Sequence, residues 1–110
     1  MYKRQIYEID IASGAATPVY SASTTDAKPW GMAYDPDTNT LYWNNGGTLF
    51  SSPYGPTLTP TSVSMSYNAA TVNFVALAFR NGKLLGTRNI ATEAVYEIDP
   101  ANGVATLLYT

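Results

Sequence analysis

Two pairs of carboxylates are the first groups in this chain that could do acid–base chemistry. Glu8 and Asp10 are two residues apart, and so are Glu97 and Asp99. Side chains two apart on a strand point to the same face, and paired carboxylates can do acid–base work or glycoside hydrolysis. Both pairs, however, occupy the same place in a repeated Tyr-Glu-Ile-Asp block, and active sites rarely recur in that way. We therefore interpret them as solubilising and turn-capping residues.

A second acidic group, Asp35 and Asp37, has the composition of a calcium loop. The segment lacks the alternating acidic ligands and the terminal Glu of an EF-hand loop. Pro36 presets the backbone for a turn, and Asp side chains bond their own backbone in turns. Turn formation is therefore the favoured interpretation, and we predict neither a metal nor a cofactor.

Composition excludes several classes of function. The 110 residues contain no Cys and no His, which removes thiol chemistry, disulfides and imidazole bases. The net charge of −2 argues against nucleic-acid binding. There is no apolar run long enough to span a membrane and no signal peptide, so we expect no membrane partner. The compartment stays open.

The chain is internally repetitive. The block at residues 5–20 reappears at residues 94–109, a shift of 89 residues, which is close to twice 45. An intermediate copy confirms the period, because the segment at 31–34 matches that at 76–79 after 45 residues. A period in this range is typical of stacked-repeat architectures.

The local pattern predicts strands joined by tight turns. β-branched and aromatic runs between turn residues predict strands at 5–10, 16–20, 31–34, 40–44, 48–51, 61–67, 75–80, 83–87, 94–99 and 105–109. Asn81 and Gly82 predict a two-residue hairpin turn, which needs positive φ at both positions. Residues 31–34 and 75–79 alternate large and small side chains. We expect such strands to be buried on both faces and to lie innermost.

These features resemble known repeat families. Residues 29–43, Pro-Trp-Gly-Met-Ala-Tyr-Asp-Pro-Asp-Thr-Asn-Thr-Leu-Tyr-Trp, are similar to the first two strands of a blade in YWTD, NHL and YVTN-like β-propellers. Leu-Tyr-Trp-Asn-Asn at 41–45 is close to the YWTD element but lacks its Thr and Asp. The stretch at 96–103 resembles the third strand and turn of many bacterial blades.

The resemblance implies an all-β fold of antiparallel four-stranded blades. It divides the partial propeller of residues 1–110 into a blade at 31–67, a blade at 75–109 and an outer half blade at 5–20. Propellers close with four to eight blades, and an open arc exposes apolar faces. We therefore expect a homo-oligomer, with a dimer favoured by length. A trimer, a piece of a longer propeller and an engineered chain are the alternatives.

In such propellers ligands occupy one end of the central channel. The resemblance assigns to that end the loops at 21–30, 44–47, 68–74 and 88–93. Trp30 is expected in the core, whereas Trp43 and Tyr54 have no aromatic repeat equivalent and are expected at the surface. The candidate ligand-binding residues are Asp26, Lys28, Trp43, Asn44, Asn45, Asn73, Arg88 and Asn89.

Three functions are compatible with these residues. The favoured one is a non-catalytic binding or interaction module for a glycan or a protein, using polar loop contacts and aromatic stacking. The first alternative is a hydrolase or lyase that uses loop carboxylates. The second is a designed or minimal propeller unit without a selected ligand. No nucleophile–base pair or phosphate-binding glycine motif points to an enzyme.

Overall fold

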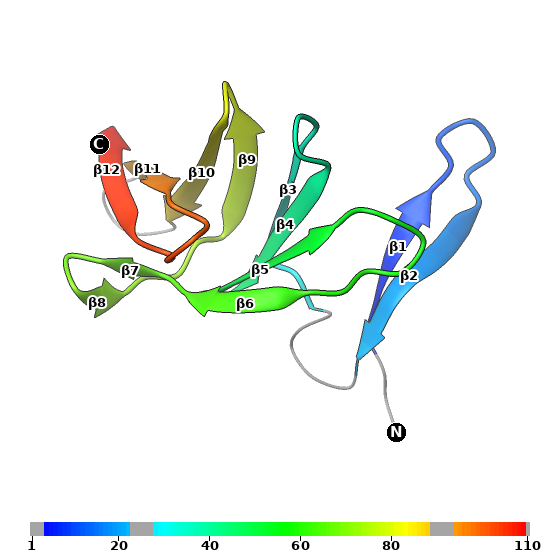
Figure 1. The fold of residues 1–110 in the computed structure, drawn as a ribbon, viewed down its shortest axis with the longest axis horizontal. Helices are drawn as coiled ribbons and strands as arrows, with labels where there is room; N and C mark the ends of the chain where they lie inside the picture. The colour runs from blue at the N-terminus through cyan, green and yellow to red at the C-terminus, as the bar shows by residue number, and fades with distance from the viewer. Residues whose placement is uncertain (1–3, 23–27, 89–93, 110) are drawn as a thin grey trace.

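The computed structural model describes residues 4–22, 28–88 and 94–109, which form strands without any helix (Figure 1). No helix that could cross a membrane occurs in this described part. The strands are β1 (Arg4–Ile9), β2 (Ala16–Ala22), β3 (Gly31–Asp35), β4 (Thr40–Asn45), β5 (Thr48–Pro53), β6 (Thr61–Ser64), β7 (Ser66–Tyr67), β8 (Ala70–Thr71), β9 (Ala76–Arg80), β10 (Lys83–Arg88), β11 (Ala94–Ile98) and β12 (Ala105–Tyr109).

The strands form antiparallel sheets in sequence order. Two sheets have four strands each, β3-β4-β5-β6 and β9-β10-β11-β12. Two smaller sheets are the hairpins β1-β2 and β7-β8. The predicted class, all-β with antiparallel four-stranded sheets, is confirmed.

One predicted strand is interrupted. Residues 61–67 were expected to be continuous, but β6 ends at Ser64 and β7 begins at Ser66. Between them Met65 is fully buried, and its N–H donates to the carbonyl of Gly47 at 2.8 Å. The short strand β8, which the sequence pattern did not predict, follows a turn in which Asn68 and Ala69 both have positive φ.

The predicted hairpin turn at Asn81 and Gly82 is confirmed, because their φ angles are 53° and 77°. It joins β9 to β10, and Lys83 pairs with Arg80 directly beside it. A tight turn at this place fixes the register of both strands.

The innermost strands of the two four-stranded sheets, β3 and β9, pack side by side. A Cβ atom on Gly31 would come within 2.8 Å of the Leu77 backbone nitrogen, so only glycine permits this approach. Burial on both faces, however, was wrong for both strands. On β9 Ala76 and Ala78 are exposed, and Val75 just before it is 43% exposed. On β3 one face is covered and the other is not. Ala33 is buried, but Met32 and Tyr34 are 40% and 42% exposed because no described strand covers their face.

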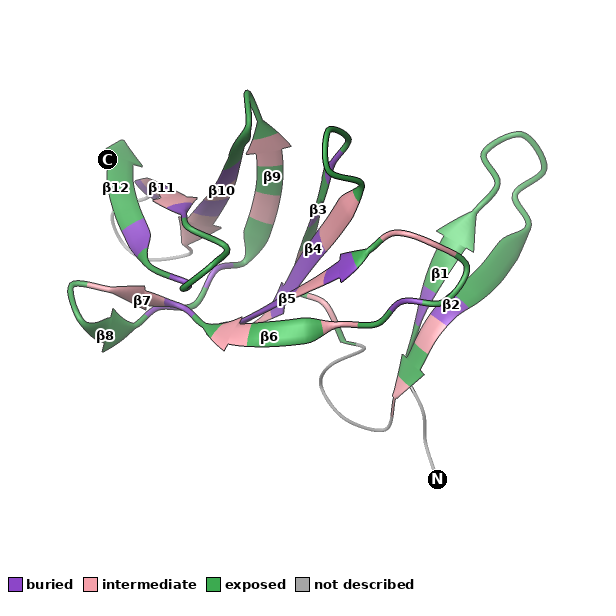
Figure 2. Ribbon diagram, viewed as in Figure 1, coloured by how far each residue is buried: buried purple, intermediate pink, exposed green. Residues whose placement is uncertain are grey.

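Two hydrophobic clusters hold the sheets together (Figure 2). The larger lies between the four-stranded sheets and includes Phe74, Leu84, Tyr96 and Ile98. The smaller lies between the β1-β2 hairpin and strands β4 and β5. Its centre is Trp43, which is 0% exposed.

Trp43 packs against two further aromatic side chains in this smaller cluster. Its ring stacks on Phe50 with 5.7 Å between centroids and tilts against Tyr20. The expectation that Trp43 lies at the surface is therefore wrong. Trp43 has no aromatic repeat equivalent, yet it is buried, because it packs in the cluster that its sheet forms with the β1-β2 hairpin.

Candidate functional site

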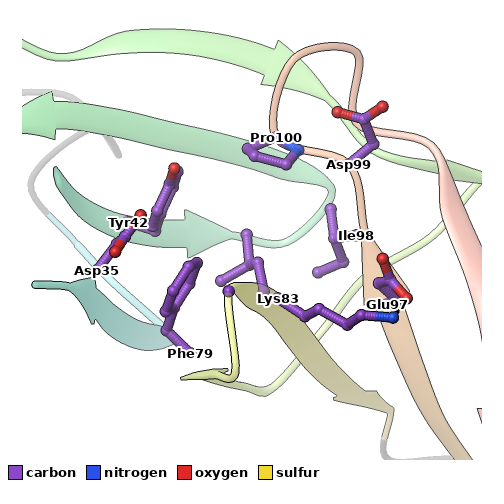
Figure 3. A pocket seen from close by; sticks show the side chains of 10 residues that line it. Asp35, Tyr42, Phe79, Lys83, Glu97, Ile98, Asp99 and Pro100 are labelled. Carbon is purple, nitrogen blue, oxygen red and sulfur yellow. Dashed lines mark hydrogen bonds and ion pairs between the residues drawn. The ribbon is translucent and has the colours of Figure 1, made fainter. Parts of the chain in front are cut away.

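A groove of about 300 Å³ opens between the two four-stranded sheets, beside the turns that join β3 to β4, β9 to β10 and β11 to β12 (Figure 3). Its apolar wall contains Tyr42 from β4 and Phe79 from β9, whose rings are nearly parallel with centroids 6.2 Å apart. The residues that line it are Asp35, Tyr42, Phe79, Gly82, Lys83, Leu84, Glu97, Ile98, Asp99 and Pro100.

Asp35 is held as an anion by its own turn. Its Oδ2 accepts the Thr38 hydroxyl at 2.7 Å, and its Oδ1 accepts the Asp37 N–H at 2.9 Å. The Thr38 hydroxyl is the main cause that lowers the pKa of Asp35, with the backbone N–H groups of Asp37 and Thr38 acting in the same direction against desolvation. A carboxylate with a lowered pKa accepts hydrogen bonds well but is a poor proton donor.

Tyr42 supplies a hydroxyl donor on the apolar wall. Burial raises its pKa above the ordinary value, and the negative charge of Asp35 adds to the effect. The phenol therefore stays protonated at all physiological pH values.

Charged side chains from β10 and β11 line the groove as well. The Lys83 ammonium lies 3.2 Å from Oε1 of Glu97, and both side chains are well exposed. An exposed ion pair of this kind contributes at most about 1 kcal/mol, so both charges can reorient toward a ligand. Asp99 caps the β11–β12 turn, where its Oδ1 accepts the Ala101 N–H at 2.9 Å. Three carboxylates and one ammonium give the groove a negative balance.

The two carboxylate pairs found in the sequence are separated by the fold. Glu97 and Asp99 line the groove, whereas Glu8 and Asp10 lie on the β1-β2 hairpin outside it. The turn-capping interpretation is confirmed for both aspartates, because Asp10 accepts the Ala12 N–H just as Asp99 accepts that of Ala101. Glu8 accepts the hydroxyl of Tyr54, which raises the pKa of that tyrosine.

Those expected ligand-binding residues that the structure describes lie toward the opposite ends of the strands from this groove. Asp26 and Asn89 are outside the described residues. Asn44 is fully buried, and its Nδ2 donates to the carbonyls of Phe74 at 2.7 Å and Gly46 at 3.1 Å. Within the described part its Oδ1 is buried without a hydrogen-bond partner. Asn44 therefore ties one sheet to the segment that enters the next.

Other candidates at that end are partly occupied by structural contacts. Asn45 donates to the carbonyl of Lys28 at 2.7 Å. Arg88 lies over the ring of Tyr96 and donates to its hydroxyl at 3.2 Å. Asn73 is exposed. Trp30, expected in the core, is 48% exposed, so that expectation was wrong.

Sequence reasoning missed the groove because its residues come from three turns of two different sheets. Lys83, which directly follows the Asn-Gly turn, was not singled out. The one available signal was the spacing of Glu97 and Asp99, which are two residues apart and are therefore expected to point to the same face. Among the described residues no group of three acidic side chains is close enough to hold a metal ion.

Comparison with known proteins supports the fold. No protein-family profile matches the chain, and no curated protein matches its sequence. Its structure is similar to that of a periplasmic gluconolactonase from Pseudomonas aeruginosa, PpgL, with a TM-score of 0.55 and 17% sequence identity. The match covers 93% of this chain and 32% of that protein, so the chain spans about a third of its length. At this identity the likeness concerns the fold alone, a propeller-like arrangement of antiparallel sheets.

Proposed function

We propose that the chain is a binding module of propeller type that takes a neutral, polyhydroxylated ligand of the sugar class in the groove between its two four-stranded sheets. The observation that carries the proposal is that Asp35, Glu97 and Asp99 line one groove together with the aromatic side chains of Tyr42 and Phe79. Carboxylates accept strong hydrogen bonds from hydroxyl groups, and the aromatic wall suits the C–H face of a sugar ring.

The charge of the groove indicates which sugars it favours. Three carboxylates outnumber the single ammonium of Lys83. A sugar acid would meet repulsion from like charges at close range. Neutral sugars and lactones are therefore expected to bind better than the corresponding acids.

The proposed role is non-catalytic, and the state of Asp35 supports this. General acid catalysis needs a carboxyl group that is still protonated near neutral pH. The hydrogen bond from Thr38 lowers the pKa of Asp35, which moves the carboxyl away from that condition. Asp35 is suited to anchor a ligand hydroxyl rather than to donate a proton.

Hydrolysis of a sugar lactone is the second candidate. It is favoured by the likeness to a gluconolactonase and by the carboxylates in the groove, one of which could act as a base on water. The discriminating assay follows ring opening of glucono-δ-lactone by proton release. Turnover above the uncatalysed rate that disappears on Glu97→Gln would establish the hydrolase instead of the binding module.

The test of binding uses a repeat-matched pair of variants. Asp99→Asn keeps the turn acceptor but removes the charge from the groove, while Asp10→Asn makes the same change in the copy outside it. Saturation-transfer NMR with glucose, gluconate and glucono-δ-lactone measures binding. A hydrogen bond to a charged group is worth about 1.5–3 kcal/mol, so Asp99→Asn should weaken binding at least about tenfold. Asp10→Asn should leave it unchanged, and equal losses in both variants would refute the groove.

We also propose that the two four-stranded sheets, 31–67 and 75–109, are blades of one arc and that β1-β2, 5–20, is the outer half of another. The pattern at 29–45 supports blades of the YWTD, NHL or YVTN-like type. Exposed apolar side chains support self-association: Tyr7 and Ile9 of β1 are exposed, and so are Ala76 and Ala78 of β9. Light scattering over a dilution series tests for the expected dimer. A protein partner or a unit without any ligand would appear as a folded chain that binds no sugar.

A further inference from the structure

The β1-β2 hairpin is a structural copy of the β11-β12 hairpin. Residues 6–9 of β1 pair with β2 as residues 95–98 of β11 pair with β12, with every partner moved by 89 positions. Both pairings contain a bulge at the same place, with Val19 as the extra residue in one and Leu108 in the other. Bulges are specific features that re-aim a strand, so a shared bulge marks the same structural role.

The turns of the two hairpins have the same hydrogen bond and nearly the same glycine φ angle. Gly14 donates to the carbonyl of Asp10 at 2.7 Å, and Gly103 donates to that of Asp99 at 2.7 Å. The φ angles of the glycines are 76° and 77°. The chain therefore builds the same outer hairpin twice.

The inner neighbours of the two hairpins differ. Strand β11 pairs on its second edge with β10, which in turn pairs with β9. Within the described residues β1 pairs with β2 alone. A strand edge of this kind presents N–H and C=O groups to any strand that approaches it, and Figure 1 shows that this edge of β1 faces the β3-β4 side of the molecule.

The sheet beside β1 lacks the corresponding cover. In the β9 sheet, Leu77 and Phe79 are half-buried, and Phe79 stacks on Tyr42 of the neighbouring sheet. Met32 and Tyr34 occupy the same repeat positions on β3 but are 40% and 42% exposed. No described strand covers them, and Tyr34 is met by the edge of the Tyr54 ring, with centroids 6.0 Å apart. The space next to β1 and over these two side chains is therefore where the two inner strands of a four-stranded sheet would lie.

We infer that the free edge of β1 binds an antiparallel hairpin of the β9-β10 kind, supplied from outside residues 4–109. The occupant is defined by the copy that this chain already contains. Its strand nearest β1 pairs in the β10–β11 register, so a glycine lies opposite Tyr7 and a leucine lies opposite Ile9, as Gly86 faces Tyr96 and Leu84 faces Ile98. Its inner strand presents alanines to Met32 and Tyr34.

A second copy does not supply this hairpin from its own β9-β10. Those strands are already paired with β11 in that copy, and releasing them would open an equal edge there. The exchange would gain no hydrogen bonds. The donor is a polypeptide with an additional hairpin of this sequence type, and recognition is strand addition to a sheet edge.

The test uses a synthetic peptide of residues 75–88, which contains the β9-β10 hairpin and its Asn-Gly turn. The chain contains no cysteine, so one engineered thiol on each partner reports the register by disulfide formation. The protein carries Tyr7→Cys or Ile9→Cys, both at exposed positions. The peptide carries Gly86→Cys or Leu84→Cys, which gives two in-register and two swapped combinations.

Tyr7→Cys should cross-link to the Gly86→Cys peptide, and Ile9→Cys should cross-link to the Leu84→Cys peptide. Each should exceed its swapped combination at least about tenfold, because in this register the swapped positions are diagonal neighbours roughly 7–8 Å apart, which is too far for a disulfide bond without movement of the backbone. Hydrogen exchange with the unmodified peptide should slow in β1. A peptide of residues 94–109 should have no effect, since β1-β2 already fills that place.

Several outcomes would overturn the inference. Equal yields in all four combinations would mean random collision. A dominant swapped pair would mean a different register. Protection in β11 without protection in β1 would mean that the peptide replaces the protein's own hairpin. The proposed sugar site is the groove between the two four-stranded sheets and not the edge of β1, so the result of the sugar-binding test is independent of these three outcomes.

Discussion

The paired glycines of the two repeated hairpins allow a sharp test of how tightly the arc is packed. Gly14 and Gly103 have φ angles of 76° and 77° in turns with the same hydrogen bonds. A Cβ on Gly14 would meet nothing within 4 Å. A Cβ on Gly103 would run into the carbonyl oxygen of Ser64 and lie 3.2 Å from the Cα of Met65. Alanine at both positions therefore separates backbone strain from the loss of packing.

The magnitudes follow from these contacts. A left-handed conformation costs a non-glycine residue about 1–2 kcal/mol, partly offset by about 0.4–1 kcal/mol of lost unfolded-state entropy. Gly14→Ala should therefore cost about 1 kcal/mol. Gly103→Ala adds overpacking of about 1–3 kcal/mol, because a backbone atom cannot move aside as a side chain can. It also threatens the 3.0 Å bond from Ser66 N–H to the Gly103 carbonyl, worth about 1 kcal/mol.

Gly103→Ala should thus lower the free energy of unfolding by about 3–5 kcal/mol, a large part of the ~5–15 kcal/mol typical of a small domain. Urea unfolding followed by tryptophan fluorescence measures both variants against the parent, and an unchanged m-value is required for the comparison. Equal costs for Gly14→Ala and Gly103→Ala would refute the packing of the β11–β12 turn against Ser64 and Met65.

Three further predictions, one of them with a control substitution, test other contacts. Asp35→Asn should make the stability of the fold less dependent on pH in the acid range. Because the pKa of Asp35 is lowered in the folded state, the carboxylate stabilises the fold above the unfolded pKa of about 4, and this contribution is lost as the pH falls through the lower folded pKa. An unchanged dependence of the urea midpoint on pH below pH ~4 would contradict this. Gly86→Ala should lower the free energy of unfolding, measured by thermal melts, by about 1–3 kcal/mol, because its Cβ would lie 2.6 Å from Phe74 Cδ1. The control Gly55→Ala, with open space around the new Cβ, should change that free energy by no more than about 0.5 kcal/mol. Trp43→Ala should destabilise the whole chain by about 3–5 kcal/mol, and a melting temperature equal to that of the parent would show that Trp43 is not a core residue.

Much of the strand pattern could be predicted because it rests on local signals. The Asn-Gly pair at 81 and 82 needs positive φ at both residues wherever it occurs, and it forms the expected hairpin. The prediction was wrong at Met65, where the strand breaks. That break depends on a hydrogen bond to Gly47, which lies 18 positions earlier in the chain, and no local pattern contains it.

The candidate site was less predictable, because burial and convergence are properties of several sheets together. Trp30 and Trp43 were assigned opposite environments from those observed, since their exposure depends on whether a neighbouring sheet lies over them. Asp35 and Lys83 line the same groove only because β3 of one sheet packs against β9 of the other.

The sequence by itself determined the all-β class, the turns and the duplication of one hairpin, because periodicity, glycine conformation and repeated blocks act over a few neighbouring residues. The tertiary structure alone decided which face of each strand is covered, where a groove opens and which strand edge has no neighbour among the described residues. The physical reason is that the β1-β2 and β11-β12 hairpins have nearly the same local pattern and backbone. Yet Tyr7 is 49% exposed and Tyr96 is 3% exposed. The rings of Tyr67 and Phe74 pack on Tyr96, whereas in the first hairpin Ile6 and Val19, and not Tyr7, pack against the neighbouring sheet.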